Sequence, residues 1–171
     1  MNKGVLHKLS YGMYVISSVN NGKFNGQIAN TAFQITSQPI RIAISINKEN
    51  LTHKYIKNSG VFSVSILSTE APFKFIGLFG FRSGRDVNKF EDVNYIIGDT
   101  GAPIVTDHSL GYLEAKIVNF LDAGTHTLFL GEVLNAEKLG EGTPMTYDYY
   151  HNVVKGKTPK KAATYIEEVK K

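Results

Sequence analysis

The sequence predicts a mainly β chain that forms a closed or partly closed antiparallel barrel with two to three short helices. Residues 40–47 (IRIAISIN) and 61–67 (VFSVSIL) alternate with the period of two that a half-buried strand requires. Asn20, Asn21 and Gly22 tolerate positive φ, so they predict a hairpin turn before a strand that starts near Lys23. Many short strands with such turns are typical of a barrel whose openings or edges are covered by helices.

Helices are predicted at three places. Residues 5–9 form a short opening helix, and residues 51–59 (LTHKYIKNS) have helical spacing, with Asn50 or Thr52 as a cap and Gly60 at C′. Residues 69–79 have Pro72 near a helix start and an apolar stripe of aromatic and aliphatic side chains.

The remaining strands follow from β-branched and aromatic composition. Residues 11–19 form the first strand, and residues 110–121 and 125–138 form the two longest, joined by the short loop 122–124. Residues 154–159 are expected to be irregular, and residues 162–171 are expected to be frayed.

Composition limits the class of protein. The 171 residues, 42% hydrophobic and 20% charged, fit one globular domain. The chain has no Cys, which excludes disulfides, thiolate metal sites and a Cys nucleophile. Neither a signal peptide nor a membrane-length apolar run is visible, so we expect a cytoplasmic protein without membrane partners.

The net charge of +4 comes from lysines that are spread along the chain and concentrate only in residues 155–171. This distribution favours a mildly basic surface that attracts small anionic cofactors over a nucleic-acid interface.

Polar side chains are interleaved with small and apolar ones in residues 25–39 (NGQIANTAFQITSQP). A plain half-buried strand tolerates this pattern. Alternatively, the amides and hydroxyls hydrogen-bond a heteroaromatic ring that has both donors and acceptors, such as an isoalloxazine. The polar residues concerned are Gln27, Asn30, Thr31, Gln34 and Thr36.

Two further segments combine features of an anion site. Residues 45–53 (SINKENLTH) run from a strand end into a helix start, where Ser45, Asn47, Lys48 and free helix N–H groups converge. Residues 81–90 (FRSGRDVNKF) hold two Arg, a Ser, a Gly and a Lys. Ordinary helix capping and a charged surface loop are the alternatives.

His126, beside the turn at Gly124, is either structural or functional. The other His residues lack metal-ligand spacing, so we predict no metal site. Neither GxSxG nor a GxGxxG after a strand is present.

Taken in order, NGQIANTAFQITSQP, SINKENLTHKYIKNSGVFSVSIL, FRSGRDVNKF and THTLFLGEV resemble the flavin-reductase-like FMN-binding proteins. The tail PMTYDYYHNVVKGKTPKKAATY resembles the end of the flavin domain in flavoredoxins and high-molecular-weight rubredoxins. The resemblance implies a Greek-key split β-barrel that binds FMN and forms a homodimer, with FMN near the subunit interface. It also implies a single domain over residues 1–171, with about 155–171 as an extended tail.

The resemblance carries over residue by residue. Asn30, Thr31, Ala32 and Phe33 would line the flavin ring, with Gln27 and Gln34 beside them. The phosphate end would contact Asn47, Lys48, Thr52 and His53, and the second binding loop would supply Ser83, Gly84, Arg85 and Lys89. His126 would lie where a nicotinamide approaches, in a segment whose family Asp is replaced by Thr125.

Three functions stay open at this point. The leading one is an FMN oxidoreductase or flavin reductase that takes electrons from NADH or NADPH. The second is an FMN electron carrier that works with a rubredoxin or another protein partner and does not oxidise nucleotides. The third is a barrel that binds a nucleic acid or a small ligand without flavin. A relative that holds FAD or a pyridoxal phosphate is a further alternative, because one fold hosts several functions.

Overall fold

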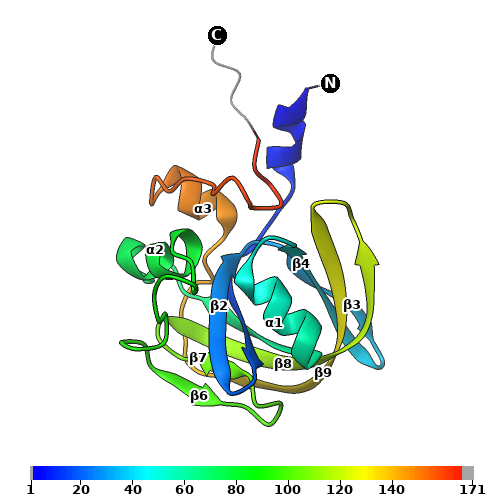
Figure 1. The fold of residues 1–171 in the computed structure, drawn as a ribbon. Helices are drawn as coiled ribbons and strands as arrows, with labels where there is room; N and C mark the ends of the chain where they lie inside the picture. Colours follow the sequence, from blue (N-terminus) through cyan, green and yellow to red (C-terminus); the bar gives the residue numbers. More distant parts are fainter. Residues whose placement is uncertain (1, 167–171) are drawn as a thin grey trace.

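The computed structural model describes residues 2–166, which fold around one curled antiparallel sheet (Figure 1). Its strand order is β2-β1-β5-β8-β9-β4-β3, and a second sheet pairs β6 with β7. The mainly β prediction is confirmed. The strands are β1 (Tyr14–Asn20), β2 (Lys23–Ala29), β3 (Ala32–Ser37), β4 (Ile40–Asn47), β5 (Val61–Leu67), β6 (Tyr95–Ile97), β7 (Pro103–Val105), β8 (Ser109–Asp122) and β9 (His126–Lys138).

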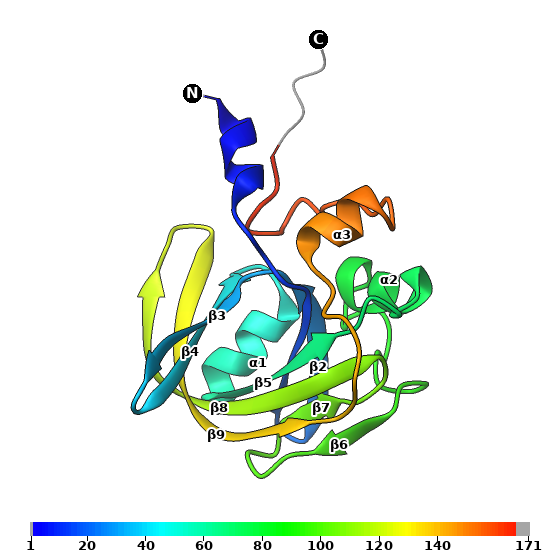
Figure 2. The same ribbon diagram turned by 180° about the vertical axis from the view of Figure 1, so that it is seen from behind.

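Helices occupy the opening and one end of this barrel. Figures 1 and 2 show α1 across the opening, and α2, α3 and the C-terminal segment together at one end. No helix among residues 2–166 is long and apolar enough to cross a membrane. The helices are a 3-10 helix (Lys3–Lys8), α1 (Leu51–Ser59), α2 (Phe73–Phe81) and α3 (Tyr147–Asn152).

The barrel interior is built by the alternation seen in the sequence. Ile42, Ile44 and Ile46 of β4 are buried, and they join a cluster with Ile56 of α1 and Phe62 of β5. Each such side chain contributes on the order of 2 kcal/mol by leaving water. The cluster fixes α1 against the barrel, and with it the end of β4 from which α1 starts.

A second apolar cluster lies where α2 and α3 meet the barrel. It includes Met13, Phe75, Phe79, Phe90 and Tyr150. The rings of Phe79 and Phe90 meet edge-on at 5.8 Å between centroids. This packing anchors both ends of the loop that follows α2.

Local predictions held where the signal was strong. The β1–β2 turn has positive φ at Asn21 (49°) and Gly22 (73°), and Gly60 ends α1 in the left-handed region (φ 73°). The second helix begins at Phe73 rather than at residue 69, because Pro72 stands at its N-cap. Residues 154–159 are irregular as expected, whereas the predicted fraying of 162–171 falls in part on residues 167–171, outside the described residues.

Candidate cofactor site

A cavity of about 390 Å³ opens at the helical end of the barrel. Its walls come from β2, β4, α2, the loop after α2, α3 and the C-terminal segment. The apolar part is contributed by Met13, Ile76 and Phe79, all members of the second apolar cluster. A volume of this size matches sites that hold one cofactor-sized molecule.

The barrel wall of the cavity is polar. Gln27, Asn30, Ser45 and Asn47 line it from β2, from the residue after β2 and from the end of β4. The side-chain carbonyl oxygen of Gln27 is buried and has no hydrogen-bond partner among residues 2–166. Side-chain amides and hydroxyls of this kind offer both donors and acceptors to a ligand.

The loop after α2 forms a second wall with a fixed backbone. The Ser83 hydroxyl accepts a hydrogen bond from the Arg85 N–H at 3.2 Å, and the Arg85 guanidinium donates to the Glu49 carbonyl at 3.3 Å. Gly84 packs so closely that a Cβ there would lie 1.9 Å from Oδ1 of the buried Asn25. Only glycine fits this position without a shift of the loop or of Asn25.

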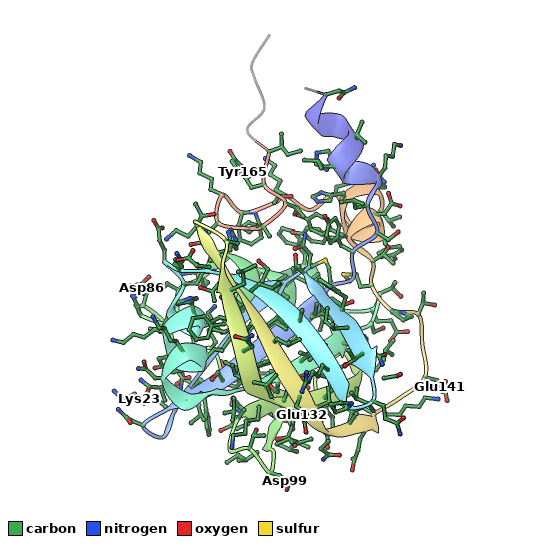
Figure 3. The ribbon with its side chains drawn as sticks, turned by 90° about the vertical axis from the view of Figure 1, so that its right-hand side faces the viewer. Lys23, Asp86, Asp99, Glu132, Glu141 and Tyr165 are labelled. Carbon is green, nitrogen blue, oxygen red and sulfur yellow. The ribbon has the colours of Figure 1, made fainter. Side chains whose placement is uncertain are left out.

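The C-terminal segment 157–164 forms a third wall. Its side-chain tethers are Lys161 Nζ to Glu49 Oε2 at 2.8 Å and Asn30 Nδ2 to Thr164 Oγ1 at 2.6 Å. The Tyr150 hydroxyl also donates to the Lys157 carbonyl at 3.2 Å. Figure 3 labels Asp86, in the loop after α2, and Tyr165, which follows the C-terminal segment.

His126 also lines the cavity, and both of its ring nitrogens have partners. Nε2 lies 3.3 Å from the Lys161 carbonyl, and Nδ1 lies 2.9 Å from the Thr125 hydroxyl. Because a carbonyl only accepts, Nε2 carries the proton in the neutral ring, and Nδ1 accepts from Thr125. Burial lowers the pKa of His126, an effect partly offset by the hydrogen bond to Lys161, so the neutral ring is favoured.

Positive charge dominates the cavity. Among the described residues, no Asp or Glu lines it, whereas five lining side chains are cationic: Arg82, Arg85, Lys157, Lys160 and Lys161. Glu49 lies just outside, and its hydrogen bond and charge interaction with Lys161 lower the pKa of its carboxyl group. Such a cavity attracts anionic ligands.

The structure brings together about half of the residues predicted for the site. The lining includes these predicted residues: Gln27, Asn30, Ser45, Asn47, Ser83, Gly84, Arg85 and His126.

Other predicted residues lie away from the cavity. Thr31 precedes the edge strand β3, which carries Ala32, Phe33 and Gln34. Lys48 is exposed and forms an ion pair with Asp122 at 2.6 Å. Contacts between these residues and a cofactor in the same chain stay predictions.

Three predicted residues are buried beneath the site. Thr52 Oγ1 accepts from Asn25 at 2.8 Å, and His53 Nε2 pairs with Thr127 Oγ1 at 2.8 Å. The Lys89 ammonium donates to the carbonyls of Gly26 (2.9 Å) and Phe79 (3.2 Å), and burial lowers its pKa to about 8. These side chains join α1 and the loop to the barrel, so they support the walls.

Sequence reasoning missed most of the third wall. The cavity is lined by residues 157 and 159–163 and by Tyr147 and Tyr150 of α3, whereas only the concentration of lysines in this tail was singled out from the sequence. The density of lysines there was the available signal. In the part of the chain that the structure describes, no group of His, Asp and Glu side chains could hold a metal ion.

Comparisons with known proteins agree with this architecture. Residues 6–156 match the flavin reductase like domain. The chain is 50% identical over 165 residues to the high molecular weight rubredoxin of Moorella thermoacetica, covering 96% of this chain and 72% of that protein. It is also 50% identical over 167 residues to the ferric-chelate reductase (NAD(P)H) of Archaeoglobus fulgidus, covering 98% and 99%.

Among solved structures, the Streptomyces globisporus C-1027 NADH:FAD oxidoreductase superposes with a TM-score of 0.75 at 25% identity, covering 83% of each chain. The split-barrel prediction is thereby confirmed. With a family model matching most of the chain and two relatives at half identity, the protein belongs to the flavin reductase like family.

Proposed function

We propose that the protein is an FMN-dependent oxidoreductase that takes electrons from NADH or NADPH and passes them to an acceptor. The observation that carries this proposal is the cavity itself, which combines a polar barrel wall and an apolar wall with five cations and no carboxylate among the described residues that line it. An uncharged heteroaromatic ring joined to a phosphate matches this distribution.

The residues present fit FMN. Gln27, Asn30 and Asn47 line the cavity, and their amide groups would face the edge of the ring. Arg82, Arg85 and the backbone N–H groups of the loop suit the phosphate. The tightly packed Gly84 keeps that loop in place.

Bound FMN supplies the redox chemistry, accepting a hydride and releasing electrons singly or in pairs. The protein's own residues bind, orient and exclude water. The neutral His126 offers an Nε2–H donor at the cavity, and this group would orient the carboxamide of a nicotinamide donor. The Thr125 hydroxyl holds the tautomer by donating to Nδ1.

Use of a nicotinamide nucleotide is supported by the relatives' own descriptions. One is a ferric-chelate reductase that uses NAD(P)H, at half identity over nearly all of both chains. Another is an NADH-dependent FAD reductase from Streptomyces globisporus, at 25% identity over 72% of this chain. The choice between NADH and NADPH stays open.

An FMN electron carrier is the second candidate, and the half-identical high molecular weight rubredoxin favours it. This chain has no Cys and so supplies no thiolate iron ligands. A separate rubredoxin or another electron-transfer protein would then exchange electrons with the bound FMN.

We also propose that the protein is a homodimer with FMN near the subunit interface. Large apolar side chains are about half exposed or more on neighbouring strands, and a second copy would cover them. The same contact would bring the edge residues from Thr31 to Gln34 toward the partner's cofactor. The exposed side chains are Phe33, Ile35, Ile40, Phe120 and Leu121.

Residues 1–171 would form one flavin domain, with about 155–171 as its extended tail. A cytoplasmic location stays a prediction.

Steady-state oxidation of NADH and NADPH separates the two candidates. The first predicts rapid oxidation with a ferric chelate or free flavin as acceptor. The second predicts no oxidation with either nucleotide, yet electron transfer between the reduced protein and a rubredoxin. Purified protein that neither contains FMN nor takes it up would contradict both.

A further inference from the structure

The cavity has two cationic walls, and one bound flavin phosphate accounts for only one of them. Arg82 and Arg85 belong to the loop after α2, whereas Lys157, Lys160 and Lys161 belong to the C-terminal segment. The loop lies within the family match to residues 6–156, and the three lysines lie beyond it. The lysine wall therefore needs its own explanation.

The C-terminal wall is tethered differently from the loop. In the part of the chain that the structure describes, the Lys161 ammonium forms an ion pair with Glu49. The Lys161 backbone carbonyl accepts a hydrogen bond from Nε2 of His126. Lys161 and Glu49 are both exposed, with side-chain exposures of 53% and 70%. Exposed ion pairs contribute little to stability, so this tether opens readily.

The position of the tether has a consequence for a second ligand. A ligand that accepts a hydrogen bond from Nε2 of His126 must displace the Lys161 carbonyl. A donor that takes the place of this carbonyl moves the segment outward. Such a shift separates Lys161 from Glu49 and leaves its ammonium free for another anion.

We propose that residues 157–161 form the binding wall for the phosphate groups of the nucleotide donor, and that Lys161 exchanges Glu49 for a donor phosphate when the donor binds. This inference rests on the proposed function, because it adds the donor's binding residues to the same cavity. Lys157 and Lys160, which line the cavity from the same segment, extend the cationic surface along the donor. Glu49 then acts as a competitor of the donor for Lys161.

The exchange predicts opposite effects for the two members of one ion pair. The measurement is the Kd of NADP⁺ and of NAD⁺ for the FMN-loaded oxidised protein, in which no turnover occurs, alongside the Kd of FMN. Lys161→Gln should weaken nucleotide binding about fivefold, and Glu49→Gln should tighten it about two- to fivefold. The affinity for FMN should change less than about twofold in both variants.

A matched ion pair serves as the control. Lys138 and Glu141 form an exposed pair that does not line the cavity. Lys138→Gln and Glu141→Gln should each leave the Kd of both nucleotides unchanged. If Glu49→Gln weakens nucleotide binding as Lys161→Gln does, the ion pair only holds the C-terminal segment in place, and the proposal is overturned. Unchanged nucleotide affinity in both variants, or an equal loss of FMN affinity, also overturns it.

A separate readout keeps this test independent of the flavin assignment. In FMN-free protein, NADP⁺ should slow amide hydrogen exchange in residues 157–164 of the wild type and of Glu49→Gln, but not of Lys161→Gln. Failure of FMN binding with this protection intact would refute the proposed function alone. If NADP⁺ gives no protection in the FMN-free wild type, although the wild type binds FMN and NADH or NADPH reduces it normally, the donor wall alone is refuted.

Discussion

The two cationic walls of the cavity differ in how their backbones are held. The loop after α2 is fixed by close packing at Gly84 and by the buried Lys89 ammonium. This ammonium donates hydrogen bonds to backbone carbonyls of β2 and α2. The C-terminal wall is held at its start by close packing of Gly156 on the Tyr150 ring and by hydrogen bonds from α3 to Gly156, Lys157 and Thr158. Farther along, at residues 161–164, it is held by an exposed ion pair and two hydrogen bonds, and this part is the one that can open. A rigid wall suits a resident cofactor, and a wall that opens suits a substrate that must enter and leave in each cycle.

The largest effect is expected from overpacking the rigid wall. In Gly84→Ala the new methyl group overlaps Asn25, whose buried amide is bonded to Thr52 and cannot easily move. Overpacking costs up to about 3 kcal/mol, so the Kd of FMN should rise about a hundredfold. Fluorescence titration measures this. Gly77→Ala in α2, which meets no atom within 4 Å, is the control and should bind FMN normally.

The next effect concerns the support under the rigid wall. The pKa of Lys89 is lowered to about 8 by burial, so between pH 8 and its unfolded pKa of about 10.4 the unfolded state holds more protons. Stability therefore rises with pH in this window.

We expect the wild type to gain about 2 kcal/mol relative to Lys89→Met between pH 8 and pH 10, measured by urea unfolding of both proteins. Parallel pH profiles for the two would show that the Lys89 ammonium is not desolvated in the folded protein.

The smallest effect comes from His53, which joins α1 to β9 behind the polar wall. Burial, and then the charges of Lys57 and Lys48, lower its pKa. The unfolded chain therefore takes up this proton first as the pH falls below about 6.5, and stability decreases.

Urea unfolding at pH 7 and pH 5 should show a smaller loss in His53→Gln than in the wild type. His7→Gln, in the N-terminal 3-10 helix, should behave as the wild type does. An unchanged pH dependence in His53→Gln would remove His53 from this account.

Local signals predicted the barrel well. Residues 40–47, 51–59 and 61–67 matched their elements because strand alternation, helical spacing and Gly60 are all encoded within a few neighbouring residues. The three-residue strands β6 and β7 were missed because they are too short to display a period. The six-residue α3 was missed because its aromatic run obscures the cap at Thr146, whose side chain accepts from the Tyr149 N–H.

The site was predictable where its residues form a local pattern. Gln27, Asn30, Ser45 and Asn47 are polar side chains in or directly after strands, and they line the cavity. The predicted loop residues Ser83, Gly84 and Arg85 line it as well. The lysine wall was not predictable, because its position depends on pairing between Lys161 and Glu49, which are far apart in the sequence. Long-range contacts of this kind leave no local pattern.

The most direct test of the central claim is an anaerobic absorbance titration of the FMN-loaded protein, first with NADH and then with NADPH. The account predicts that the flavin band near about 450 nm bleaches rapidly with at least one nucleotide. A protein that stays yellow with both nucleotides would contradict the oxidoreductase assignment and favour a carrier reduced by a protein partner. A protein that does not take up FMN would contradict the cofactor site itself.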